Sequence, residues 1–419
     1  MRTLTMHLIA VAGMTLFPGI VRSQWTTVNS GTTEDLRSIF FPTANIGYVV
    51  GGTGSNGIIM RTDNQGTDWD SVFSHSTPIT DIYFHDITGY AVSFDRDTIF
   101  RLATIWFPYW EKQKQNGVSP GDRPLTNIVF TDDTTGYSPG FKTTDGGQNW
   151  IRQDSSINSF PHLASDICFV NDSTGFIAGY DYWGTIYKTT NKGINWTQIN
   201  IPSTVWEVYS INFPTPDIGY AAALLKIGST YTDAILKTTD NGENWDTIFT
   251  LTGSLNSRLS CIRCTDANTC YAVGNGGVII KTTDGGEHWF KQVSGTTAVL
   301  KKIFFTSPET GYIVGTGGTI LKTTNGGGPS GILERNNHPT FTVKISPNPM
   351  HQEANIEVAG VLSKNTRFHL FDLSGRELMQ QAIITTHTLI DRAEIPDGLY
   401  LYTISQGNTT MSKGKLVIQ

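Results

Sequence analysis

One nine-residue phrase, repeated along the chain, constrains the fold more than any other feature of the sequence. It reads Lys-Thr-Thr-Asp-Gly-Gly-Glu-His-Trp at residues 281–289. Its skeleton is Thr-x-Asp/Asn-x-Gly-x-x-Trp. A phrase that returns at intervals indicates a repeat architecture in which each copy belongs to one structural unit. Full or looser copies occupy residues 61–69, 142–150, 188–196 and 237–245, and a shortened copy without Trp occupies residues 322–327.

The residue types in the phrase predict a tight turn between two strands. Asp or Asn in the middle can bond to the backbone two residues on, and the Gly that follows tolerates positive φ. The closing Trp begins the next strand with a large apolar side chain to bury. We therefore interpret each copy as a β-hairpin with a structural turn and a buried anchor. The turn residues are Asn64, Asp145, Asn191, Asp240, Asp284 and Asn325, and the anchors are Trp69, Trp150, Trp196, Trp245 and Trp289.

A second repeat lies between the phrases and sets the number of units. A strand that begins with Gly-Tyr or its equivalent recurs at intervals of 39 to 51 residues, which is the length of a four-stranded propeller blade. The sequence therefore predicts an all-β fold, a seven-bladed β-propeller. The aromatic positions of the seven units are Tyr48, Tyr90, Tyr137, Phe176, Tyr220, Tyr271 and Tyr312.

The two ends of the array complement each other. The seventh unit stops at Gly328 without a Trp strand, whereas residues 24–33, which contain Trp25, resemble residues 288–297 of the sixth unit. We expect the N-terminal segment to supply the missing outer strand of the last blade, with Trp25 as its anchor. A ring closed in this way leaves no sheet edge open at the join. Residues 24–328 are thus predicted to form one closed propeller.

The start of the chain and its charge predict export. Residues 1–23 combine Arg2, an apolar run at 8–17 and a small residue at Ser23, which is the pattern of a secretory signal peptide. No later run is apolar over the roughly 18 residues of a membrane helix, so no integral membrane segment is expected. A net charge of −6 and a pI near 5.8 disfavour nucleic acid as a partner. The mature chain is predicted to be secreted or held at the outer cell surface.

The C-terminal part of the chain follows a different pattern. Residues 329–338 are rich in Gly, Pro and Asn and are typical of a linker. Residues 339–419 alternate apolar and polar positions between Gly turns. That alternation predicts a small antiparallel β-sandwich as a second domain.

The cysteines suggest one disulfide. Cys264 and Cys270 flank a short turn between two strand-like runs, and an exported protein permits pairing. We expect them to form a hairpin disulfide, with a pair of free thiols as the alternative. Cys168 and Cys261 are interpreted as buried thiols. Because no His lies at zinc-finger spacing from these residues, we expect no metal site, and the sequence gives no indication of a cofactor.

The phrase resembles the Asp-box (BNR) motif, and the tandem array resembles the propellers of the photosystem II assembly and stability factor family. Sortilin, sialidases and xyloglucanases are related to that family in architecture. The resemblance covers residues 24–328 and implies a fold without implying an activity. In these families the box is a structural turn at the blade periphery. Export places the chain away from a thylakoid membrane, so the photosystem role is not expected to transfer.

The tail resembles the type A sorting domain of the type IX secretion system. Pro347-Asn348-Pro349, the run at 373–376, the run at 396–400 and a last strand opened by Lys413 and Lys415 carry the resemblance. It implies that the tail takes the protein across the outer membrane, with the type IX secretion machinery as a partner. An ordinary adhesive β-sandwich is the alternative.

Catalytic interpretations find little support. A sialidase needs an arginine cluster and a Tyr nucleophile with a Glu partner, and no arginine here lies in the Arg-Ile-Pro context of that family. A xyloglucanase places two carboxylates across a cleft between two propellers, and this chain has one array. Asp95, Asp97 and Asp181 are conceivable acids. Solvation of loops is the favoured role for them.

A binding role fits the departures from the repeat. The loops that join the second and third strands of a blade share one face, and on that face some units carry inserted aromatic and charged residues. Such side chains can stack on sugars or grip a peptide, although they can also pack against neighbouring loops. We predict a non-catalytic ligand-binding or scaffolding module for an extracellular glycan or protein, with a secreted glycoside hydrolase or a purely structural surface protein as alternatives. The candidate ligand residues are Asp95, Arg96, Tyr180, Asp181, Tyr182, Trp183 and Tyr231.

Overall fold

A computed structural model describes most of the chain outside the predicted signal peptide, residues 1–23, which lies beyond the described part. No helix in the described part is long and apolar enough to cross a membrane. The described residues are 24–95, 98–113, 126–152, 163–181, 183–251, 258–328, 332–334, 342–359, 366–392, 394–406 and 409–419.

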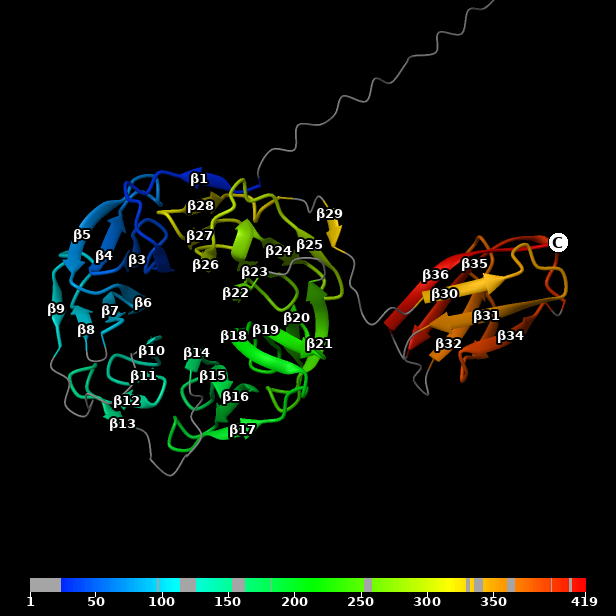
Figure 1. The fold of residues 1–419 in the computed structure, drawn as a ribbon, viewed down its shortest axis with the longest axis horizontal. Helices are drawn as coiled ribbons and strands as arrows, with labels where there is room; N and C mark the ends of the chain where they lie inside the picture. Colours follow the sequence, from blue (N-terminus) through cyan, green and yellow to red (C-terminus); the bar gives the residue numbers. More distant parts are fainter. Residues whose placement is uncertain are drawn as a thin grey trace, which may run out of the picture.

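Seven antiparallel sheets stand around a central axis like the blades of a propeller (Figure 1). In each blade the first strand lies nearest the axis and the last forms the rim. Blade 1 contains β2 (Leu36–Phe40), β3 (Gly47–Thr53), β4 (Asn56–Thr62) and β5 (Asp70–His75). Blade 2 contains β6 (Ile79–His85), β7 (Thr88–Ser93), β8 (Ile99–Leu102) and β9 (Trp110–Lys112). Blade 3 contains β10 (Val129–Phe130), β11 (Gly136–Ser138), β12 (Phe141–Thr143) and β13 (Ile151–Arg152).

The remaining blades repeat this order, and the last one takes its outer strand from the start of the chain. Blade 4 contains β14 (Leu163–Phe169), β15 (Gly175–Asp181), β16 (Trp183–Thr189) and β17 (Thr197–Ile199). Blade 5 contains β18 (Val205–Asn212), β19 (Gly219–Ile227), β20 (Thr230–Thr238) and β21 (Asp246–Leu251). Blade 6 contains β22 (Leu259–Cys264), β23 (Cys270–Gly274), the 3-10 turn η1 (Asn275–Gly277), β24 (Ile279–Thr282) and β25 (Trp289–Lys291). Blade 7 contains β26 (Leu300–Phe305), β27 (Gly311–Gly315), β28 (Ile320–Thr323) and β1 (Thr26–Val28).

The predicted seven-bladed fold and its closure by the N-terminal strand are confirmed. β1 pairs antiparallel with β28, and Thr27 lies opposite Leu321. Trp25, which precedes β1, is 1% exposed and donates its indole N–H to Oε1 of Gln292 in blade 6 at 2.8 Å. Its ring also meets Tyr271 and Phe305 edge-on. The closing strand is therefore held both by its sheet and by the neighbouring blade.

Aromatic pairs join one blade to the next, and they explain the Gly-Tyr repeat. A Phe lies at or next to the end of the inner strand, and its ring packs on the Tyr or Phe of the blade before it; Phe130, for example, lies 3.7 Å from Tyr90 between ring centroids. That ring also covers the Gly of its own blade, because a Cβ on Gly136 would lie only 2.5 Å from Phe130. Five further ring pairs follow the same rule: Tyr48–Phe84, Tyr137–Phe169, Phe176–Phe213, Tyr271–Phe305 and Tyr312–Phe41.

Blade 6 departs from this rule at both positions. Cys264 stands where the other blades have Phe, and Cys270 where they have Gly. The two residues lie opposite each other in β22 and β23, and their sulfur atoms form a disulfide. It lies in the same buried cluster as Tyr220 of blade 5. The disulfide therefore fills the place of the Phe–Gly pair. The other two cysteines are free: Cys261 is buried, and Cys168 is half-buried instead of fully buried.

The lysine at the start of the repeated phrase forms a hydrogen bond to the next blade. Lys281 donates to the backbone oxygen of Gly326 in blade 7 at 2.8 Å, and its Nζ lies 5.3 Å from the centroid of the Tyr271 ring. Lys322 of blade 7 reaches the backbone oxygen of Gln65 in blade 1 in the same way. The ring is therefore closed by a side-chain contact as well as by β1.

Residues 332–334 of the expected linker form a further strand, β29 (Ile332–Glu334), which pairs antiparallel with β25 at the rim of blade 6.

The C-terminal part is a sandwich, as predicted. One sheet contains β30 (Thr342–Ser346), β31 (Glu353–Ala359) and β34 (His387–Asp391). The other contains β33 (Glu377–Ala382), β32 (Thr366–Phe371), β35 (Gly398–Gln406) and β36 (Thr409–Ile418). Both sheets contribute to one buried cluster that includes Ile356, Phe368, Ile404 and Leu416.

Candidate functional site

The Asp and Asn residues of the repeated phrase use their oxygens inside their own turns. In blade 6, Thr282 Oγ1 donates to Asp284 Oδ1 at 2.8 Å and accepts the N–H of Gly286 at 2.9 Å, while the N–H of His288 donates to the same Asp284 oxygen. Asn191 in blade 4 makes the same contacts without a charge. Because an amide replaces the carboxylate with no change in geometry, these contacts favour a structural role over a catalytic one.

The ionisation of these turns follows from their hydrogen bonds. Donors from the side chain and backbone of Asn244 lower the pKa of Asp240 to about 2, against a small opposing effect of burial. A carboxylate with such a pKa stays ionised and is a poor general acid at neutral pH. Among the described residues, two partly exposed groups of His and acidic side chains lie close enough to hold a cation: His85 with Asp86 and Asp133, and Asp284 with Glu287 and His288. Nothing beyond their proximity points to a metal.

Asp95 is engaged in a local network at the end of β7. Its Oδ2 lies 3.2 Å from His75 Nε2 and accepts from Thr98 Oγ1 at 2.9 Å. Burial raises the pKa of Asp95, but hydrogen bonds from Ser93, His75 and Thr98 outweigh it, so the pKa is lowered. These contacts hold Asp95 to its own blade through Thr98 and to blade 1 through His75. Arg96, Asp97, Tyr182 and the side chain of Asp181 lie outside the described residues.

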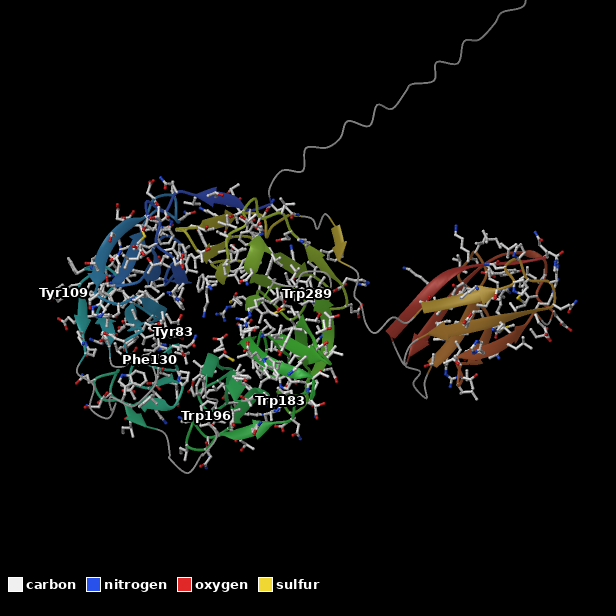
Figure 2. The ribbon with its side chains drawn as sticks, in the orientation of Figure 1. Tyr83, Tyr109, Phe130, Trp183, Trp196 and Trp289 are labelled. Atoms are coloured by element: carbon white, nitrogen blue, oxygen red, sulfur yellow. A yellow bond between two sulfur atoms is a disulfide. The ribbon has the colours of Figure 1, made fainter. Side chains whose placement is uncertain are left out.

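Three of the predicted residues meet around a ring that the sequence analysis missed. Trp206, near the start of β18, lies 5.8 Å from Tyr180, 5.1 Å from Trp183 and 5.8 Å from Tyr231 between ring centroids. Lys226 Nζ sits 4.2 Å from the centre of the Trp206 ring. We call these five residues the aromatic cluster. Trp183, labelled in Figure 2, is 53% exposed and Tyr231 is 43% exposed.

The hairpins of blades 4 and 5 place the aromatic cluster on one face. The β19–β20 hairpin has nine residues in each strand, more than any other hairpin in the propeller, and carries Lys226 and Tyr231 near its tip. The β15–β16 hairpin carries Tyr180 and Trp183 at its tip. Trp206 could have been singled out from the sequence, because it is a Trp that does not occupy the position that closes a blade. Asp95 is not part of the cluster, because it lies in blade 2, with blade 3 between.

A second exposed aromatic group replaces the missing phrase of blade 2. Trp106, Phe107 and Tyr109 are 64%, 77% and 73% exposed in the turn between β8 and β9. Figure 2 shows Tyr109 at the outer edge of the ring. The rings belong to a different blade from the aromatic cluster and are not joined to it by any described contact.

The axis of the propeller holds a cavity of about 450 Å³, which we call the central channel. Inner strands of all seven blades line it, with Asp81, Asp166, Arg263 and Lys302 as its charged residues. Burial alone would lower the pKa of Lys302, but the nearby Asp81 and Asp166 carboxylates outweigh it, so the pKa is raised. Sequence analysis did not find the central channel, because its residues are spread over seven repeats and meet only when the ring closes.

Comparisons with known proteins agree with this architecture. Residues 344–419 match the family described as the secretion system C-terminal sorting domain. No curated protein sequence matches the chain. The chain is similar in structure to YCF48 bound to a D1 peptide, with 16% identity and a TM-score of 0.58 over 74% of this chain and 97% of that one.

Two further solved structures show the same likeness. One is the WD40 propeller of Doa1, with 10% identity and a TM-score of 0.53 over 72% of this chain and 96% of that one. The other is the GH74 xyloglucanase from Xanthomonas campestris, with 12% identity and a TM-score of 0.50 over 70% of this chain and 59% of that one. At these identities the likeness shows the fold alone. The chain is a seven-bladed β-propeller protein whose residues 344–419 are a secretion sorting domain of the type IX kind, which makes it a secreted or cell-surface protein.

Proposed function

We propose that the propeller is a non-catalytic module that binds an extracellular glycan through the aromatic cluster. The observation that carries the proposal is a group of four rings centred on the half-buried Trp206, of which Trp183 and Tyr231 are exposed, next to the Lys226 ammonium. One face of a pyranose ring carries mainly C–H groups and stacks on an indole, while its hydroxyls find polar partners at the edge. Tyr180, Tyr231 and Lys226 offer such partners.

The cluster is suited to binding because its rings are already ordered. Trp206 touches three other rings, and Lys226 lies over its face, so little rotamer freedom remains to be lost when a ligand arrives. Exposed aromatic side chains of this kind contribute large contact area at low entropic cost. The sorting domain delivers the protein to the cell exterior, which is the compartment in which an extracellular polysaccharide would be met.

The described carboxylates give less support to a glycoside hydrolase. That chemistry requires two carboxyl groups facing each other across one sugar, with the acid held at a raised pKa. Asp95 has a lowered pKa and lies in blade 2. Asp81 and Asp166 lie in the central channel, where Ser hydroxyls and backbone N–H groups donate to them.

A polysaccharide panel tests the proposal. We would incubate residues 24–419 with soluble and insoluble polysaccharides and record both retention of the protein and release of new reducing ends. Retention without release is the expected result. Release of reducing ends would establish the hydrolase instead, and neither retention nor release would favour a protein ligand or a purely structural role.

A further inference from the structure

The central channel has two layers of side chains that the inner strands arrange in register. Side chains two residues apart on a strand point to the same face, so each inner strand sends two residues toward the axis. In the deeper layer the cavity is lined by Asp81, Asn127, Asp166 and Lys302. Ser38, Ser210 and Cys261 occupy the same level of the other inner strands, where Ser38 bonds to Asp81, and Ser210 bonds to Asp166 and Cys261. The layer nearer the mouth consists of Phe40, Tyr83, Val129, Cys168, Asn212, Arg263 and Phe304.

The deeper layer is largely satisfied by contacts between blades. Asp81 accepts from Ser38 Oγ at 2.6 Å and from the N–H of Ile128 at 3.1 Å, and its Oδ1 lies 3.8 Å from Lys302 Nζ. Asp166 accepts from Ser210 Oγ at 2.7 Å and from a backbone N–H of the next blade. The carboxylates of Asp81 and Asp166 are therefore stabilised by hydrogen bonds from neighbouring blades, and the Lys302 ammonium lies beside Asp81.

The mouth layer has two unlike walls. Phe40, Tyr83 and Phe304 form an apolar wall, with Phe40 lying 5.3 Å from Tyr83 and 5.0 Å from Phe304 between ring centroids. Figure 2 shows Tyr83 on the inner side of blade 2. Across the mouth, Arg263 and Asn212 form a polar wall. The Oδ1 of Asn212 accepts the N–H of Cys264 at 2.8 Å, which leaves the amide nitrogen as a donor.

Two buried polar atoms of the central channel have no hydrogen-bond partner within the described structure. One is Nε of Arg263, whose guanidinium also has no carboxylate within ion-pair distance among the described residues. The other is Oδ1 of Asn127, which is only 8% exposed and lies one layer deeper. The unsatisfied Arg263 donor costs free energy that a ligand with a hydrogen-bond acceptor can recover.

We propose that the central channel binds a small organic carboxylate with an apolar body. Its carboxylate pairs with the Arg263 guanidinium, which presents planar N–H donors that match it, and accepts from the Asn212 amide. Its apolar body packs on Phe40, Tyr83 and Phe304. A cavity of about 450 Å³ lies within the range typical of small-molecule sites.

The site is separate from the aromatic cluster. The lining of the central channel follows the carboxyl ends of the inner strands and the turn after β26, on the face of the repeated phrase. The aromatic cluster lies at the β15–β16 and β19–β20 hairpin tips, on the other face. Binding at one site therefore requires no group of the other, and the proposal does not depend on the proposed function.

The experiment uses phenylacetate and the matched neutral amide, phenylacetamide, as probes of residues 24–419, with affinities measured by titration calorimetry and ligand-observed NMR. We expect phenylacetate to bind at least about tenfold more tightly than the amide, because a charge-assisted hydrogen bond is stronger than a neutral one. Arg263→Gln should remove that preference. Arg258→Gln is the control, since it removes an exposed arginine at the other end of the same strand.

A second variant, at Val129, tests the site independently in case Arg263→Gln fails to fold. Val129→Trp fills the mouth from a wall position that makes no described side-chain hydrogen bond, and it should weaken both probes together. Melting curves establish that each variant is folded. Equal binding of the two probes, no binding of either, or unchanged binding by Arg263→Gln would overturn the proposal. Trp206→Ala should leave phenylacetate binding unchanged, which separates this result from any result on the polysaccharide panel.

Discussion

At the scale of single residues, the turn of the repeated phrase depends on one hydroxyl and one side-chain oxygen. Thr238 donates to Asp240 Oδ1 at 2.8 Å, and Asn244 donates to both carboxylate oxygens through its N–H and its amide. Blade 4 builds the same turn on Asn191, which cannot ionise. The two versions have similar geometry but should respond differently to acid.

Replacement of Asp240 by Asn should change how stability depends on pH. The folded pKa of Asp240 is lowered from 3.8 to about 2, so its contribution to stability is present above the unfolded pKa and is lost as the pH falls through the folded one. We expect Asp240→Asn to lower the melting temperature at neutral pH and to approach wild type as the pH falls to about 2. Asn191→Asp is the matched control and should gain the same acid dependence. A pH-independent difference between Asp240→Asn and wild type would contradict this account.

At the scale of strands and blades, the Gly at the start of the second strand and the Phe near the end of the first strand form one packing unit. The Gly that begins the second strand leaves room for the Phe that ends the first, and that Phe stacks on the blade before it. Blade 6 fills the same space with a disulfide between Cys264 and Cys270. At the interface between blades 5 and 6, a disulfide within blade 6 thus occupies the place that a Phe ring occupies at the other interfaces.

The double variant Cys264→Phe with Cys270→Gly should therefore restore the pattern of the other blades. We expect it to unfold in urea close to wild type and to be insensitive to reductant. The matched variant Cys264→Ala with Cys270→Ala should lose about 2 kcal/mol or more, because it leaves a cavity beside Tyr220. If the Phe–Gly variant is no more stable than the Ala–Ala variant, the two arrangements are not equivalent.

The closing strand can be tested through its anchor. Trp25→Ala removes a buried ring and its bond to Gln292, and we expect a loss of about 3–5 kcal/mol in the free energy of unfolding, as for other buried aromatic side chains. Trp289→Ala, at a ring that is 0% exposed in blade 6, should cost a similar amount. Trp183→Ala should cost little, since that side chain is half exposed. A Trp25 variant as stable as the Trp183 variant would mean that the N-terminal strand does not hold the ring together.

These elements also show how far sequence reasoning reaches. The number of blades and the closure follow from the repeats, because each copy records its own local geometry. Trp206 escaped notice because it belongs to no repeat and its neighbours come from two blades. The layers of the central channel could not be predicted from the sequence at all. Arg263 and Phe304 are ordinary strand residues until the ring brings seven inner strands together.

At the scale of the whole molecule, the chain combines a seven-bladed propeller with a C-terminal secretion sorting domain. The sorting domain at residues 344–419 directs the protein to the cell exterior, and the propeller presents different chemistry on its two faces. One face carries the aromatic cluster of blades 4 and 5. The other opens into the central channel. We propose the aromatic cluster as a glycan-binding surface of a non-catalytic propeller.

Glycan binding by the aromatic cluster is tested by comparing the retention of wild type and Trp206→Ala on the polysaccharides that the panel identifies. We predict that Trp206→Ala, like Trp183→Ala, weakens retention by at least about tenfold, because Trp183→Ala removes the exposed indole and Trp206→Ala removes the ring against which the other three rings of the cluster pack. Tyr109→Ala should leave retention unchanged, since Tyr109 is an exposed ring in blade 2 outside the cluster. Retention that survives in both Trp variants while their melting temperatures match wild type would contradict the account.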